Sequence, residues 1–274
     1  MALKHLFLVT AVAASTFLSS TLPTIAVNPP LRTGMDVKEM TNVEVNGVKI
    51  ENFAGKVIIH SMGTNKAVRV RLKGSDDLLK QVLVEDNHGK DNGNLYIAFE
   101  KNAPLLKDLD TLTLTLEMPA KMPLDLTLVG GNGHVGPREA NETKININGF
   151  GDIKLASAQN FQSTIDGSGE ITVMNVNGDA SLVIRGDGKY VIQKGSIPQL
   201  KATIQGTGEI VVKASVKDAD LKSEGAGTMN LATVTGKLSQ SVSGAGTINI
   251  AKVSPPVAEP EHFDMNCARI PEKK

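Results

Sequence analysis

The chain has 274 residues, and its 29 Lys and Arg residues balance its 29 Asp and Glu residues, so the formal net charge at pH 7 is zero. Charges of mixed sign give no electrostatic footprint for nucleic acid. A single cysteine, Cys267, excludes an internal disulfide. The fold must therefore rest on packing and hydrogen bonds, and Cys267 is either a free thiol or a link between chains.

The first 26 residues have the pattern of a secretory signal. Lys4 and His5 precede an apolar run at 6–18, and the segment ends on the small residue Ala26. The apolar run is shorter than a membrane-spanning helix. We therefore predict an exported protein with no transmembrane segment in its mature chain. The periplasm is the main expected location, with the outer surface or secretion as the alternatives. A linker is expected at 27–36.

Residues 37–125 predict irregular β structure that leads into a more regular region. Apolar and polar residues alternate in 41–60 and 68–72, as in strands with one buried face. Residues 76–80 predict a short helical turn with Ser75 as its cap. Apolar runs at 82–84 and 95–99 flank a polar segment and predict a hairpin.

Residues 126–252 carry a repeat that predicts an all-β fold, a parallel β-solenoid with coils of about 19 residues. Successive repeats begin 18, 18, 19, 20, 19 and 19 residues apart. Such a coil is too short for a strand–helix–strand unit. The repeat is marked by seven Gly-x-Gly pairs, and we assign both glycines of each pair to stacked corners: Gly131/Gly133, Gly149/Gly151, Gly167/Gly169, Gly186/Gly188, Gly206/Gly208, Gly225/Gly227 and Gly244/Gly246.

Apolar residues flank every corner at fixed offsets. On this alignment Val129 is equivalent to Ile147, Val135 to Ile153, and His134 to Asp152. The same register predicts surface columns of alternating charge that disfavour slipped pairings. One column holds Glu170, Lys189 and Glu209, and another holds Asp166 and Arg185. Residues 253–274, with Pro255, Pro256 and Pro260, form a charged tail placed to cover the last coil.

No cofactor or metal site is predicted. The four histidines of the mature chain, His60, His88, His134 and His262, lack the spacing of paired metal ligands. Residues 86–94 resemble a calcium loop in composition only, because Lys90 and Asp91 stand where an EF-hand needs an oxygen ligand and a glycine. The Gly-x-Gly pairs precede strands, not helices, which argues against phosphate binding.

Two features of the chain resemble the DUF2807 family, the auto-transporter adhesin heads or GIN domains. They are the corners GSGEI, GTGEI and GAGTI, and the segment SDDLLKQVLVEDNHGKDNGNLYIAFE ahead of them. The resemblance covers residues 40–250. It implies a right-handed β-helix in an exported bacterial protein, and it brings no catalytic residues. The chain departs from the family pattern at Phe150, Lys189 and Tyr190.

Three functions remain open at this point. The favoured one is a non-catalytic envelope or surface protein that binds a glycan or protein through a flat solenoid face, adhesin-like by resemblance. The second is an envelope polysaccharide-modifying enzyme. Its candidate catalytic residues are Asp152 and Glu170, which stack about 5 Å apart, a separation that suits retaining glycoside hydrolysis. The third is a scaffold that self-associates through sheet edges.

Overall fold

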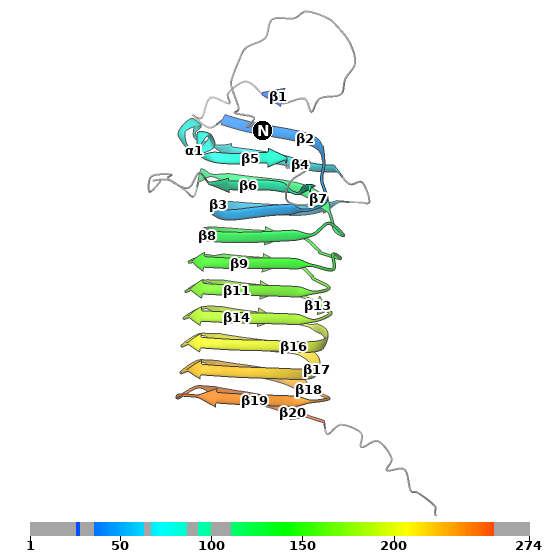
Figure 1. The fold of residues 1–274 in the computed structure, drawn as a ribbon, viewed down its shortest axis with the longest axis vertical. Coiled ribbons are helices and arrows are strands. Elements are labelled where there is room, and N and C mark those ends of the chain that lie inside the picture. Colours follow the sequence, from blue (N-terminus) through cyan, green and yellow to red (C-terminus); the bar gives the residue numbers. More distant parts are fainter. Residues whose placement is uncertain (1–25, 28–35, 63–66, 87–92, 100–110, 255–274) are drawn as a thin grey trace, which may run out of the picture.

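The computed structural model describes residues 26–27, 36–62, 67–86, 93–99 and 111–254. These residues form a straight column of stacked β coils (Figure 1), which confirms the predicted parallel β-solenoid. Residues 1–25, 28–35 and 255–274 lie outside the described residues, so the signal segment, most of the linker and nearly all of the tail stay predictions. Cys267, His88 and His262 also lie outside the described residues, so what the sequence predicts for them stays a prediction.

The strands follow one another with one short helix between them. In chain order they are β1 (Ala26–Val27), β2 (Asp36–Glu44), β3 (Val48–Met62), β4 (Ala67–Gly74), α1 (Asp76–Lys80), β5 (Val82–Asp86), β6 (Leu95–Phe99), β7 (Thr113–Pro119), β8 (Leu124–Val135), β9 (Thr143–Gly149), β10 (Asp152–Leu155), β11 (Phe161–Gly167), β12 (Glu170–Val173), β13 (Val176–Asn177), β14 (Ala180–Gly186), β15 (Lys189–Ile192), β16 (Gly195–Gly206), β17 (Glu209–Gly225), β18 (Thr228–Val234), β19 (Leu238–Ser243) and β20 (Thr247–Val253).

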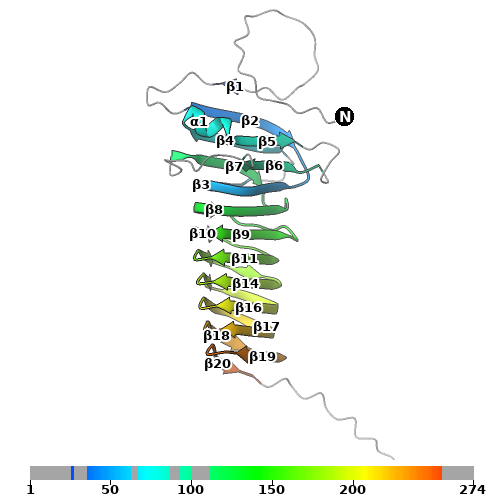
Figure 2. The same cartoon turned by 60° about the vertical axis from the view of Figure 1, so that its left-hand side comes forward.

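Each regular coil has three sides. The coil that starts at β11 shows them in order: β11 forms the first side, β12 follows the glycine corner as the second side, and β13 forms a short third side. Each strand pairs in parallel with its counterparts in the coils before and after it, as β11 does with β9 and β14. Figure 2 shows the first and second sides as separate stacks. One coil therefore adds one strand to every side.

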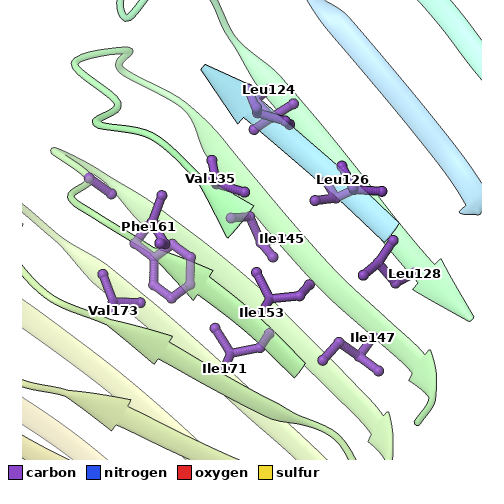
Figure 3. Packing of buried hydrophobic residues seen from close by; sticks show 14 of the residues in the cluster. Leu124, Leu126, Leu128, Val135, Ile145, Ile147, Ile153, Phe161, Ile171 and Val173 are labelled. Carbon is purple, nitrogen blue, oxygen red and sulfur yellow. The ribbon is translucent and has the colours of Figure 1, made fainter. Parts of the chain in front are cut away.

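The core is a set of inward columns of aliphatic side chains. On the first side, Leu126 stacks on Ile145 and Leu128 stacks on Ile147. On the second side, Ile153 stacks on Ile171 (Figure 3). All of these side chains are buried. Their polar neighbours along each strand point outward, because successive side chains of a strand alternate between its faces. The buried columns bind consecutive coils together.

The N-terminal end of the column differs from the regular coils because antiparallel strands complete it. β2 pairs antiparallel with β4, and β4 with β7. β5 and β6 form the antiparallel hairpin that the sequence predicts. Helix α1 occupies the predicted helical turn and buries Leu78 and Leu79, although the side chain of Ser75 makes no capping hydrogen bond. In the solenoid itself, parallel pairing begins at β3, which pairs with β6, β7 and β8.

Two different physical constraints require the two glycines of a corner. The first glycine has a positive φ, for example +143° at Gly206, and a Cβ there would clash with the carbonyl oxygen of Gly186. The second glycine faces the core: a Cβ on Gly208 would lie 2.7 Å from Cγ2 of Ile184. The same Cβ would also lie 2.6 Å from the carbonyl oxygen of Gly188. The first position thus needs glycine for backbone conformation and close backbone approach, and the second for side-chain packing and close backbone approach.

The structure places both glycines of the later pairs at the corner between two strands, and it gives the second glycine a packing role as well. In the later pairs this residue has no positive φ and stands one position before a strand of the second side. A Cβ there would press on the inward residue of the preceding coil that lies two positions before its first glycine. These contacts are Gly169 against Ile147, Gly188 against Ile165, Gly208 against Ile184, Gly227 against Ile204 and Gly246 against Ser223, and at each position the Cβ would also crowd a carbonyl oxygen of the preceding coil.

The pair Gly149/Gly151 departs from this scheme as well as from the predicted register. Gly151 has a φ of +143°, so both glycines of this pair have a positive φ. The predicted register stacks Gly151 on Gly133, but the structure stacks it on Gly131, since Asp152 pairs with Asn132. A Cβ on Gly151 would clash with the carbonyl oxygen of Gly131. Gly151 is thus held by close backbone approach and does not face a core side chain.

The alignment of the first glycine pair is wrong for the same reason. Gly133 pairs with Ile153, and Val135 pairs with Leu155, two residues away from the expected register. His134 accordingly stacks on Lys154, not on Asp152. The corner of this coil is one residue shorter than that of the next coil. Three residues (129–131) separate Leu128 from Asn132, whereas four residues (148–151) separate their register partners Ile147 and Asp152. Gly133 then occupies an inward slot, where a Cβ would approach Ile153 Cγ1 to 3.1 Å.

Candidate functional site

The outer surfaces of the three sides are the candidate binding faces of the described residues. No group of three or more metal-ligating side chains is found among them. A small cavity of about 20 Å³ lies at the N-terminal end, lined by Met40, Val70, Leu72 and other residues. That volume holds about one water molecule. No helix in this part of the chain has the length and hydropathy that a membrane crossing requires.

The first face is a polar surface whose charges neutralise one another. Asp166 and Arg185 are direct neighbours on β11 and β14, and an Arg185 Nη1–Asp166 Oδ1 distance of 2.9 Å makes them an ion pair. Further along the column, Gln205 and Lys222 both donate to Glu224. The hydrogen bond from Lys222, followed by that from Gln205, lowers the pKa of Glu224. Exposed pairs of this kind contribute about 0–1 kcal/mol each.

The second face carries the column that holds Asp152 and Glu170. Glu170 neighbours Lys189, and Lys189 pairs with Glu209 at 2.9 Å. The hydrogen bond to Glu209 raises the pKa of Lys189. Glu170 accepts a hydrogen bond from the hydroxyl of Thr172 at 3.0 Å, and Asp152 is exposed.

Asp152 and Glu170 are register partners on β10 and β12, as the repeat spacing predicts. The cavity found in the described residues lies at the N-terminal end and has neither carboxylate in its lining. A glycosidase needs converging groups around a bound sugar. The surroundings of these two carboxylates therefore give no support to catalysis.

The third face is basic. We define it as residues 174–179, 193–199, 213–218, 232–237 and 251–254. It holds five exposed lysines, Lys194, Lys213, Lys217, Lys237 and Lys252, against two aspartates, Asp179 and Asp218. None of these lysines forms an ion pair with a carboxylate of the described residues.

The two aspartates of this face are occupied by the backbone of the next coil. Asp179 Oδ1 accepts from the backbone N–H of Gln199 at 3.1 Å, and Asp218 Oδ1 from that of Lys237 at 2.8 Å. Their role is to shape the turn from the third side to the first. The lysines therefore dominate the surface potential of this face.

Sequence reasoning missed this face, although the sequence carries a signal for it. Lys194 and Lys213 are 19 residues apart, and Lys217 and Lys237 are 20 apart. Both spacings match the coil length. The signal is found only when the charges are counted separately for each side of the coil, because the chain as a whole is neutral.

The residues that depart from the family pattern have separate structural roles. Tyr190 is fully buried, and its hydroxyl donates to Ser163 Oγ at 2.8 Å. Phe150 is 65% exposed at its corner, and its ring lies against Gly130. Lys189 belongs to the charge column of the second face.

Arg138 is a buried cation without a carboxylate partner among the described residues. It is 1% exposed, and its Nη2 donates to the carbonyl oxygens of Pro119 and Met122. Nε and Nη1 have no hydrogen-bond partner in the same part of the chain. Burial lowers the pKa of Arg138 to about 10. Its two bonds hold the turn between β7 and β8, which is a structural role.

Comparison with known proteins agrees with the fold. The model of the family described as "Putative auto-transporter adhesin, head GIN domain" (DUF2807) matches residues 49–252. A "putative adhesin" from Bacteroides fragilis is 20% identical, with a TM-score of 0.60, over 80% of this chain and 97% of its own. A "putative lipid binding protein" from Parabacteroides distasonis is 13% identical, with a TM-score of 0.52, over 80% and 97%. No curated protein matches the chain.

Proposed function

The chain belongs to the DUF2807 family of adhesin-head GIN domains, and on this premise we propose that it is an exported, non-catalytic interaction protein of the cell envelope or cell surface that binds an anionic glycan through its third face. The observation that carries the proposal is the row of lysines that lack a carboxylate partner among the described residues; Lys213 donates a hydrogen bond to the neutral side chain of Gln193 at 3.0 Å. The charged columns of the other two faces contain ion pairs, whereas the described lysines of the third face have no carboxylate partner. An anionic ligand would supply the missing charge.

The spacing of the lysines fits a linear polymer. Lys194 and Lys213 lie on consecutive coils, which are about 4.8 Å apart, and Lys252 lies two coils beyond Lys213. The row therefore extends for about 14 Å along the column. A polysaccharide with a carboxylate or phosphate on its repeating unit presents charges along its length at comparable intervals.

The composition of the face favours recognition by charge. The third face of the described coils has no aromatic residue on which sugar rings or nucleobases would stack. It also lacks a large apolar surface for insertion into a lipid layer: its exposed large apolar side chains are Met174 and, in the inward slot of the last coil, Val253. We therefore expect moderate, salt-sensitive binding.

Paired substitutions test the proposal. Lys194→Gln with Lys217→Gln removes two charges from the third face. The matched control, Lys154→Gln with Lys201→Gln, removes two exposed charges from the second and first faces. We expect the first double variant to bind an acidic polysaccharide about tenfold more weakly at low salt, equivalent to about 1.4 kcal/mol, and the control to bind like the wild type. Equal losses in the two variants would reject the third face as the site.

A further inference from the structure

The C-terminal end of the column is open. β19 pairs with β17, and β20 pairs with β18, and within the described residues no strand lies on their other side. Figure 1 shows these two strands as the last of the stack. The backbone N–H and C=O groups on that side form an exposed edge on two sides of the coil, and such edges pair readily with another strand.

The inward side chains of this coil are uncovered. Val242 is 48% exposed, whereas its register partner one coil earlier, Ser223, is fully buried. Val253 is 49% exposed, and its partner Val234 is fully buried. Leu238, Ile248 and Ile250 are only partly buried, although they pack on the core. An apolar core that ends at solvent in this way marks a surface that another element covers.

The edge also lacks the charges that usually protect one. β19 has the sequence LSQSVS, without a charged residue, and in β20 the charge is Lys252, next to its last residue. At the other end of the column, β2 carries Asp36, Lys38, Glu39 and Glu44. The charge-free edge of β19 can meet a copy of itself without like charges facing each other.

The residues that follow do not continue the solenoid pattern. Residues 255–274 match one coil in length, but a further repeat of 19 would put Glu259 and Glu261 in the inward slots of Gln240 and Val242. It would put Phe263 in the corner position of Gly244, whose φ is +110°. Pro255, Pro256 and Pro260 have no N–H to donate to a strand ladder. The sequence of this segment is thus unsuited to adding a strand on β19 and β20.

From these observations we infer that two copies of the chain associate end to end through their last coils. A twofold axis across the open end brings β19 against β19 and β20 against β20 of the second copy, each pair antiparallel. The pairing covers Val242 and its apolar neighbours with their own equivalents. The contact is isologous, and the other end of the column differs in strands, charge and helix α1, so association stops at the dimer. A dimer carries two third faces, which would strengthen binding to a polymer.

The mass of the purified chain in solution, with residues 255–274 in place and a reductant present to exclude a Cys267 disulfide, tests this inference. We expect light scattering to give twice the chain mass at micromolar concentration. Val242→Lys places a charge at the open end and is expected to weaken the dimer at least a hundredfold. Ser181→Lys lies in the same outward column as Ser239 but mid-stack, and should leave the dimer unchanged.

A variant that ends at Ser254 tests which of two candidates covers the open end, a second copy of the chain or residues 255–274. If it dimerises as the longer chain does, the second copy covers the coil. A monomeric longer chain would overturn the inference, and if removal of 255–274 then produced a dimer, the segment itself would be the cover. Dimerisation of equal strength in Val242→Lys and Ser181→Lys would overturn the inference as well. Glycan binding by a monomer would be unaffected, so this outcome is distinct from a failure of the proposed function.

Discussion

Tyr190 and Ser163 form a hydrogen bond inside the core, across the solenoid from the second side to the first. The tyrosine hydroxyl donates to Ser163 Oγ at 2.8 Å, and Ser163 in turn donates to the carbonyl oxygen of Ile145. The inward neighbours of Ser163 are the larger Ile145 and Leu182. The small serine therefore leaves room for the tyrosine ring, and its hydroxyl oxygen accepts the hydrogen bond that the buried tyrosine hydroxyl donates.

We expect Tyr190→Phe to destabilise the chain by about 1–2 kcal/mol, because it leaves Ser163 with one partner fewer in a dry core. Adding Ser163→Ala should cost less than the sum of the two single changes, because the bond is already lost. Chemical denaturation of the three variants measures this coupling. Strict additivity would show that the hydrogen bond contributes nothing.

Alkaline pH should destabilise the wild type through the same residue. Burial raises the pKa of Tyr190 above its ordinary value, and the hydrogen bond to Ser163 opposes the shift. An unfolded tyrosine ionises near pH 10, whereas the folded one stays neutral. The stabilising contribution is therefore complete below pH 10 and is lost as the pH rises further. The stability difference between wild type and Tyr190→Phe should shrink from pH 9 to pH 11; a constant difference would contradict the assignment.

The two glycines of one pair should respond differently to rescue. We expect Gly206→Ala and Gly208→Ala each to destabilise by about 1–3 kcal/mol. A Cβ at position 208 would meet the carbonyl oxygen of Gly188 and Cγ2 of Ile184, and Ile184→Ala removes the second of these atoms. It should therefore recover part of the cost of Gly208→Ala. It should not help Gly206→Ala, because the obstacle there is the backbone of Gly186. Thermal unfolding of the single and double variants, with Ile184→Ala alone as the reference, decides this.

Asp152→Asn with Glu170→Gln should leave both stability and glycan binding close to those of the wild type. Both residues are on the second face, away from the lysine row, and exposed charges of this kind contribute little. Acidic polysaccharides incubated with either protein should remain uncut when reducing ends are assayed. Turnover by the wild type that disappears in the double variant would restore the enzyme hypothesis.

The repeat period and the residue types were enough to predict the solenoid, its parallel register and the stacking of Asp166 with Arg185. Glycine spacing did not reveal that the corner near Gly130 is one residue shorter than the corner of the next coil, because both corners carry the same Gly-x-Gly pattern. The errors at Gly133, His134 and Gly151 follow from that.

Other features of the structure depend on which way a residue faces. A glycine that turns the backbone and a glycine that makes room for a core side chain are the same letter, so the packing role of Gly169 or Gly188 was hidden in the pattern. The pairing of Tyr190 with Ser163 was also out of reach, since they are 27 residues apart and meet across the core. The basic third face could not be predicted before it was known which residues lie on each side of the coil.

Recognition of a polymer by its charge is tested most directly by comparing two ligands that differ in charge alone. Polygalacturonate and its fully methyl-esterified form share one backbone, and only the first is anionic. We predict that the chain binds the acid form, that binding weakens steadily as NaCl rises, and that the ester binds far more weakly at every salt concentration. Equal binding of the two forms, or acid binding that is independent of salt, would contradict the account.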